Sequence, residues 1–138
     1  MGEVMVGGRA RGLSGSEVRR IADAVLLGER REAELSVSFV GRTTMRALNR
    51  EHKGKDRPTD VLAFSLSQPG NRLVGDIYIC PTVAREQADR LGLSPRQELA
   101  RLVVHGVLHV LGHDHPEGPD REQSPMWRRQ ERYLRRLA

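Results

Sequence analysis

The sequence is poor in cysteine and aromatic residues and has no long apolar run. Its single cysteine, Cys80, excludes an intramolecular disulfide and a four-cysteine metal site. No uninterrupted apolar stretch approaches the roughly 20 residues that cross a bilayer. Residues 1–12 are rich in glycine and arginine and lack the apolar core of a secretory signal. These absences predict a cytoplasmic protein without a membrane partner, and residues 1–12 are expected to be loosely ordered.

What is present fits one charged domain with a basic surface. The 138 residues are 38% hydrophobic and 30% charged, which is typical of a globular protein with a single core. The formal net charge is +5, and Lys53 and Lys55 are the only lysines among many arginines. A basic balance favours a polyanionic partner, of which nucleic acid is the commonest. Cys80 ends an apolar stretch, and we interpret it as a small core residue.

Hydrophobic spacing and capping signals predict an α+β fold. Ser14 and Ser94 each precede a glutamate or glutamine by three residues, which is the pattern of a capping box. Gly112 follows an apolar helical segment and is expected to end it in the left-handed conformation. The polar segment 52–60 is expected to be an exposed loop, and 68–71 a turn. The predicted helices are 15–28, 45–50, 81–91, 95–111 and 124–137, and the predicted strands are 35–39, 61–64 and 74–80.

Four of the five histidines fall in one short segment, 105–115. His105 and His109 are four residues apart, so on a helix their imidazoles share one face and can bind one metal ion. A turn after Gly112 can return His113 or His115 to the same point, and spacing alone does not separate these two candidates. Three histidines with an open fourth position are typical of catalytic zinc, whose bound water ionises near neutral pH. The alternative is a chance gathering of core or surface histidines.

Two neighbours of these histidines narrow the chemistry. Zinc metalloproteases place glutamate directly after the first histidine, where it acts as general base. This chain has Gly106 there, so peptide hydrolysis is disfavoured. Asp114 is interpreted either as an acceptor that orients an imidazole or as a cap of the turn.

These residues resemble the signature of a known family. The segment from His105 to His115 reads HGVLHVLGHDH and is similar to the histidine motif of the YbeY proteins, bacterial zinc-dependent endoribonucleases that act in ribosomal RNA maturation. Residues 54–64 (GKDRPTDVLAF) and 75–79 (GDIYI) match two further blocks of that family, in the same order. The resemblance covers roughly residues 35–135.

The resemblance implies a site and a fold. His115 rather than His113 would be the third zinc ligand, beside His105 and His109. One YbeY-like metallohydrolase domain would span 1–138, with a mixed sheet, about five helices and one zinc ion at the end of a central buried helix. The implied activity is zinc-dependent endoribonucleolytic cleavage in 16S rRNA 3′-end maturation and in ribosome quality control. The implied partners are rRNA of the small ribosomal subunit and ribosomal or assembly proteins.

Three cations in the predicted loop are candidates for contact with RNA. Lys53 stands where the family usually has an arginine regarded as important for activity, so it is the candidate catalytic residue. Lys55 and Arg57 are candidate RNA-binding residues through backbone phosphates, although a solvated face is an equal alternative. The low aromatic content favours recognition by charge and shape over base stacking. The rival functions are an assembly factor with a structural zinc ion and a zinc hydrolase of another substrate.

Overall fold

The computed structural model describes residues 2–67, 73–114 and 120–137. The predicted turn at 68–71 and His115 therefore lie outside the described residues. The elements are, in chain order, β1 (Gly2–Gly7), α1 (Gly15–Glu29), β2 (Ala33–Phe39), α2 (Arg42–Lys53), β3 (Val61–Ser67), β4 (Leu73–Ile79), α3 (Pro81–Leu91), α4 (Pro95–Val110), the 3-10 turn η1 (Arg121–Gln123) and α5 (Pro125–Leu137).

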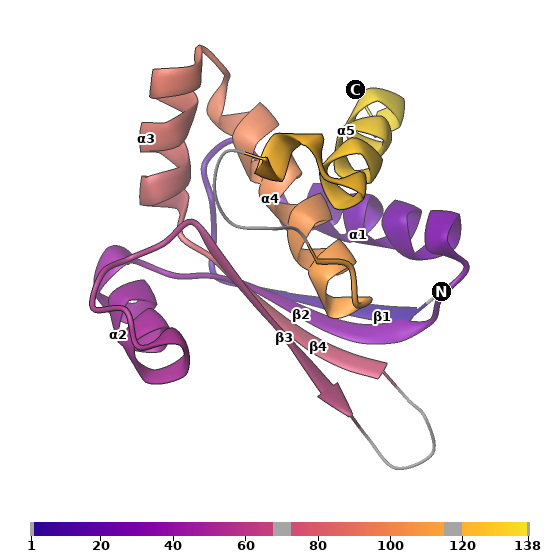
Figure 1. The fold of residues 1–138 in the computed structure, drawn as a ribbon, viewed down its shortest axis with the longest axis horizontal. Helices are drawn as coiled ribbons and strands as arrows, with labels where there is room; N and C mark the ends of the chain where they lie inside the picture. The colour runs from indigo at the N-terminus through magenta and orange to yellow at the C-terminus, as the bar shows by residue number, and fades with distance from the viewer. Residues whose placement is uncertain (1, 68–72, 115–119, 138) are drawn as a thin grey trace.

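The four strands form one mixed sheet in the order β1-β2-β4-β3 (Figure 1). β1, β2 and β4 run parallel, and β3 is antiparallel to β4. The predicted α+β class and mixed sheet are confirmed. The expectation of a loosely ordered N-terminus is wrong for residues 2–7, because they form β1 and pair along β2. Met5 is 70% exposed in this edge strand, and only Val4 and Val6 pack against the core, both partly buried, so the apolar signal in the sequence is short.

The helices lie on both faces of the sheet. α1, α4 and α5 occupy one side (Figure 1), and their apolar residues share one core with Val37, Ile77 and Ile79 of the strands. α2 packs on the opposite face, where Met45 meets Leu62 in a second, smaller cluster. Cys80 belongs to this cluster and is fully buried, which confirms its interpretation as a core residue.

The limits of α4 follow from local signals in the sequence. The Ser94 hydroxyl accepts a hydrogen bond from the backbone N–H of Gln97 at 3.1 Å, and the Gln97 side chain accepts one from the Ser94 N–H at 2.8 Å. Gly112, with φ of 98°, follows the last helical turn. Both predictions are confirmed, as is the Ser14–Glu17 capping box that begins α1. These signals place His105 and His109 in the last two turns of α4.

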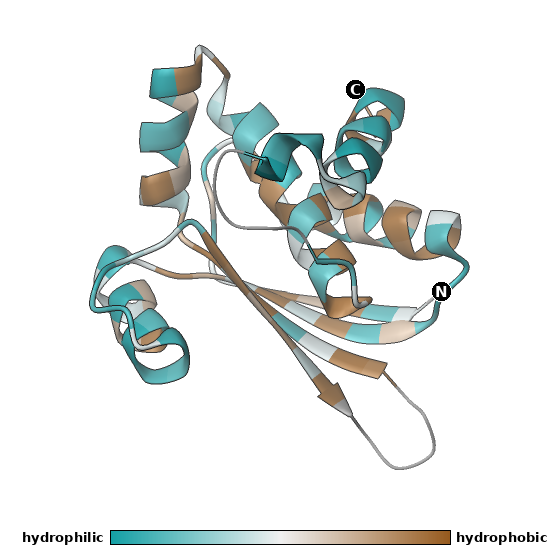
Figure 2. Cartoon of the chain, in the orientation of Figure 1, coloured by the Kyte–Doolittle hydropathy of each residue, from teal (hydrophilic) through white to brown (hydrophobic). Residues whose placement is uncertain are grey.

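Two glycines let α4 lie directly on β4. A Cβ atom at Gly106 would meet Ile77 Cγ2 at 2.7 Å, and one at Gly75 would meet Val110 Cγ1 at 2.4 Å. Figure 2 shows apolar residues on the strands and on the parts of α1 and α4 that lie over them, whereas α2 and α5 are largely hydrophilic. The close contact fixes α4 across the sheet and so fixes where its histidines stand. Among the described helices, none is long and apolar enough to cross a membrane.

Candidate metal centre

α4 presents two histidines on one face, as their spacing predicts. The ring centroids of His105 and His109 lie 4.7 Å apart, with the ring planes at 71°. The His105 residue is 6% exposed, and His109 is partly exposed at the end of the helix. Both line one cavity of about 480 Å³. The helix therefore brings two potential metal ligands to one wall of a cleft.

A glutamine from α5 determines which nitrogen of His105 can bind a metal ion. His105 Nδ1 lies 2.6 Å from Gln130 Oε1, and Gln130 is completely buried. Gln130 Nε2 donates to the Glu131 carboxylate at 3.2 Å, which fixes the amide with its oxygen toward the histidine. An amide oxygen only accepts, so Nδ1 of His105 carries the proton. Nε2 is then the nitrogen with the lone pair that a metal ion requires.

The neighbouring residues of the segment have separate roles. Asp114 Oδ1 lies 3.5 Å from Nδ1 of His109, as expected of a carboxylate that orients an imidazole. His113 is turned elsewhere, because its Nε2 lies 2.8 Å from Glu29 Oε1 of α1. Burial acts to raise the pKa of Glu29, but hydrogen bonds from Tyr133, His113 and Arg129 outweigh it and lower that pKa. His113 thus joins the end of α4 to α1 and α5.

The predicted cations line the same cavity. Lys53 ends α2, and Lys55 and Arg57 follow in the loop; all three line the cavity with His105 and His109. This loop is attached to α2, because the Asn49 side chain donates a hydrogen bond to the Arg57 carbonyl oxygen at 2.9 Å. Among the described residues, no carboxylate lies within ion-pair distance of these three cations. Within the described residues their charge is therefore not paired with a carboxylate, although Asp60 and Asp114 line the same cavity.

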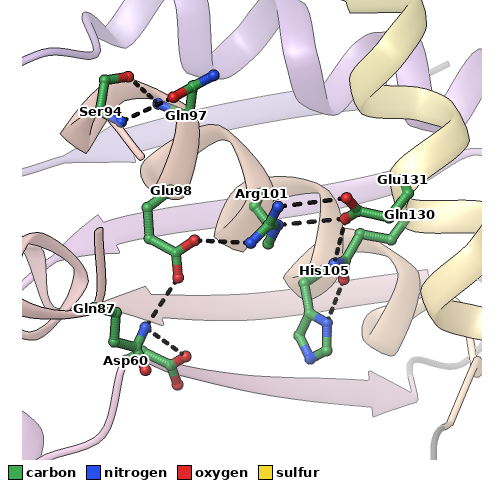
Figure 3. A network of polar contacts seen from close by, with 9 residues as sticks. All are labelled: Asp60, Gln87, Ser94, Gln97, Glu98, Arg101, His105, Gln130 and Glu131. Carbon is green, nitrogen blue, oxygen red and sulfur yellow. Dashed lines mark hydrogen bonds and ion pairs between the residues drawn. The ribbon is translucent and has the colours of Figure 1, made fainter. Parts of the chain in front are cut away.

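Further polar residues are held together by a partly buried network beside His105 (Figure 3). Asp60, at the start of β3, accepts from the Val61 N–H at 2.8 Å and from Gln87 at 3.2 Å. Burial raises the pKa of Glu98, and the nearby Asp60 carboxylate adds to this effect, although Arg101 opposes it. The network connects, in order, Asp60, Gln87, Glu98, Arg101, Glu131, Gln130 and His105.

The two described histidines fit a zinc site, although they do not complete one. Zinc prefers imidazole nitrogens, and Gln130 fixes the tautomer that offers one of them. Within residues 2–67, 73–114 and 120–137, no three His, Cys, Asp or Glu side chains are grouped to hold a metal ion. The third ligand predicted from the resemblance, His115, lies outside the described residues, so the set of three stays a prediction.

Sequence reasoning missed three residues of the site. Gln130, Asp60 and Arg121 all line one or both of the cavities beside His105. Gln130 carried one usable signal, because it is a polar residue on the buried face of the predicted last helix. Asp60 lies in the segment 54–64, which was matched to the family as a block without a role for each residue. No local sequence pattern distinguishes Arg121 from the other arginines.

The fold and this site define a class: a small α+β protein in which a buried central helix presents paired histidines to a basic cleft. The family model described as Endoribonuclease YbeY matches residues 13–138. The chain is 43% identical over 117 residues to a protein named Endoribonuclease YbeY from Geobacillus kaustophilus, covering 77% of this chain and 74% of that one. It is 42% identical over 111 residues to a protein of the same name from Staphylococcus saprophyticus, covering 75% and 71%.

A solved structure agrees with these sequence relatives. The solution structure of TM1509 from Thermotoga maritima is similar with a TM-score of 0.66 and 28% identity, and the match covers 97% of this chain and 88% of that one. The chain therefore belongs to the YbeY endoribonuclease family. This membership confirms the resemblance that the histidine motif and the two further blocks indicated.

Proposed function

We propose that this protein is a zinc-dependent endoribonuclease that cleaves single-stranded RNA in 16S rRNA 3′-end maturation and ribosome quality control. Its proposed partners are rRNA of the small ribosomal subunit and ribosomal or assembly proteins, in the cytoplasm. One observation carries the proposal: His105 and His109 line the same cavity as Lys53, Lys55 and Arg57. Metal-ligand chemistry and phosphate-binding charge therefore meet in one cleft.

The metal would be held by His105, His109 and His115. When bound, zinc supplies a Lewis acid that activates a water nucleophile and neutralises part of the phosphate charge. Gln130 holds His105 in the tautomer whose Nε2 could bind a metal ion, and the burial of Gln130 keeps that hydrogen bond away from competing water. Asp114 is proposed to orient His109 more weakly, because its Oδ1 lies 3.5 Å from Nδ1 and its side chain is 92% exposed.

The RNA would be held by the cations that line the same cavity. Lys55 and Arg57 are proposed to bind backbone phosphates, because the Asn49 bond to the Arg57 carbonyl fixes the loop that carries them. Lys53 is proposed to stabilise the charge that develops on the scissile phosphate, because it stands at the end of α2 within the same cavity. Binding through phosphates makes recognition depend on charge and strand shape.

The rival is an RNA-binding assembly factor with a structural zinc ion and no cleavage, and one observation favours it. The cavity has two described carboxylates, Asp60 and Asp114. Asp60 already accepts from Val61 and Gln87. Asp114 is highly exposed and lies beside His109. Neither carboxylate is placed as an evident general base, so the experiment must separate binding from cleavage.

The test compares two histidines of the same segment. The His109→Ala variant is expected to lose about one zinc ion per chain by elemental analysis, because a three-ligand site loses one ligand. The His113→Ala variant is the matched control and should keep its zinc, since His113 bonds to Glu29 instead. Equal zinc content in wild-type protein and the His109→Ala variant would contradict the proposed ligand set.

Cleavage is then measured on a single-stranded transcript of the 16S rRNA 3′ region. Wild-type protein should cut it with zinc and stop when a chelator is added, and the His113→Ala variant should retain the activity. Zinc retention and RNA binding without cleavage would support the structural-zinc rival. Cleavage that persists in the zinc-free His109→Ala variant would overturn the metal-dependent mechanism.

A further inference from the structure

A second cavity continues the cleft on the other side of His105. It has a volume of about 710 Å³ and lies between α3, α4 and the segment formed by η1 and α5. Three residues line both cavities: Asp60, His105 and Arg121. The two cavities therefore meet beside the histidine pair, and Arg121 is the one cation that borders both. A strand bound along the loop of Lys53 would reach this junction as it crossed the metal centre.

Arg121 is held in place by an aromatic ring. Its guanidinium carbon lies 5.1 Å from the centroid of the Trp127 ring, within cation–π distance. Trp127 lies in the first turn of α5, where its backbone N–H donates a hydrogen bond to the Ser124 hydroxyl at 3.2 Å. The ring belongs to a partly buried residue in a capped first turn, where two arginines, Arg101 and Arg121, lie over it.

The guanidinium of Arg121 makes no hydrogen bond within the described part of the chain. Its Nε atom is buried and has no hydrogen-bond partner there, and no described carboxylate lies within ion-pair distance. Arg101 stacks on the same ring at 5.8 Å, but it is paired with Glu98 and Glu131. Of the two arginines on Trp127, one is therefore neutralised by the protein and the other retains its charge for a ligand.

We infer that Arg121 is a phosphate-binding residue, which holds an RNA phosphodiester at the junction of the two cavities, in the cavity that Lys53, Lys55 and Arg57 also line. RNA as the ligand rests on the proposed function. The first cavity then has four cations against the two carboxylates of Asp60 and Asp114, which favours a polyanion. A planar guanidinium also suits a phosphate better than an ammonium does, because two N–H groups can bind two oxygens.

The test measures binding rather than cleavage. A fluorescein-labelled, cleavage-resistant 2′-O-methyl oligouridylate is titrated with the full-length protein, and anisotropy is followed at several salt concentrations. Arg121→Gln should weaken binding roughly fivefold or more and lower the salt slope by about 0.7, the share of one single-strand phosphate contact. Arg132→Gln is the matched control, because Arg132 is an exposed arginine of α5 that lines neither cavity. Arg132→Gln should leave the binding affinity and the salt slope nearly unchanged.

Trp127 provides an independent signal, because it is the only tryptophan in the chain. Addition of the unlabelled oligonucleotide should change the tryptophan emission of wild-type protein and of Arg132→Gln, and the change should largely disappear in Arg121→Gln. If Arg121→Gln does not fold, Arg121→Lys replaces it; this variant keeps the salt slope and should weaken binding about twofold. Unchanged affinity in the Lys variant would then contradict the inference.

The outcomes separate the inference from the proposed function. Wild-type protein that does not bind the oligonucleotide would overturn both. Binding by wild-type protein with equal affinities and slopes in Arg121→Gln and Arg132→Gln would overturn the role of Arg121 alone and leave the cleft of Lys53 intact. A selective loss in Arg121→Gln supports the assignment.

Discussion

The two faces of α4 are held by different interactions, close packing on one and hydrogen bonds on the other. Toward the sheet, Gly106 and Val110 fit against Ile77 and Gly75 with no room for an added methyl group. Toward the cavities, the helix carries a polar stripe with a spacing of three or four residues: Glu98, Arg101, His105 and His109. One face is thus determined by volume, and the other by hydrogen bonds.

The difference shows which kind of change each face tolerates. Added volume on the sheet side has nowhere to go, because backbone and core side chains surround it, so such changes should reduce stability. On the cavity side, partners from other helices determine how each side chain is oriented. Loss of such a partner should alter the site while the fold persists. Substitutions on each face can separate these two effects.

The largest expected effect is on the sheet side. Gly106→Val places a Cβ atom 2.7 Å from Ile77 Cγ2, and the branched side chain adds further overlap, so α4 must move away from β4. We expect the free energy of unfolding to fall by about 3 kcal/mol or more, measured by urea denaturation. Gly41→Ala is the control, because nothing lies within 4 Å of an added Cβ atom there. Equal stability of the two variants would contradict the close packing of α4.

The next effect is on the cavity side and concerns zinc affinity. Gln130→Leu keeps the buried volume but removes the acceptor that holds Nδ1 of His105. We expect zinc to bind about 10- to 100-fold more weakly in a competition with a chelating dye, because the imidazole loses its fixed tautomer. Gln123→Leu makes the same substitution at an exposed position of η1 and should have no effect. Unchanged zinc affinity in Gln130→Leu would show that His105 needs no such support.

Local signals predicted much of α4 from the sequence. The Ser94–Gln97 capping box, the four-residue step between His105 and His109, and Gly112 each depend on neighbours within one or two turns. Interactions of this range are encoded in adjacent residues, so they can be recognised without knowledge of the fold. The approximate positions of the other helices followed for the same reason.

Long-range partners could not be predicted in the same way. β1 buries only Val4 and Val6, and these only in part, and its position depends on backbone pairing with β2 across about 30 residues. Gln130 meets His105 from a position 25 residues away, through the docking of α5 on α4. In the sequence, Gly106 was informative only because zinc metalloproteases have their general-base glutamate at this position. The structure adds that a Cβ atom there would clash with Ile77, which explains why a small residue is required. Packing supplied each of these relations, and no pattern along the chain contains them.

The smallest expected effect tests the carboxylate of the polar stripe. Burial raises the pKa of Glu98 above its ordinary value of 4.5, with Asp60 adding to the rise and Arg101 opposing it. The folded protein therefore holds this proton more tightly than the unfolded chain does. As a result, the stability that Glu98 contributes is complete below its unfolded pKa and falls as the pH rises through its folded pKa.

Glu98→Gln removes this ionisation and keeps one oxygen, which can accept a hydrogen bond from Gln87 or from Arg101 but not from both, because the two donors bond to different oxygens of the carboxylate. We expect the variant to gain stability relative to wild-type protein as the pH rises from about 4 toward neutrality, by no more than about 1 kcal/mol. Thermal denaturation in a series of buffers measures the difference. A parallel pH dependence in the two proteins would show that the carboxylate is not penalised by its burial. The cavity face of α4 would then tolerate charge as readily as the protein surface does, and the contrast between its two faces would reduce to volume alone.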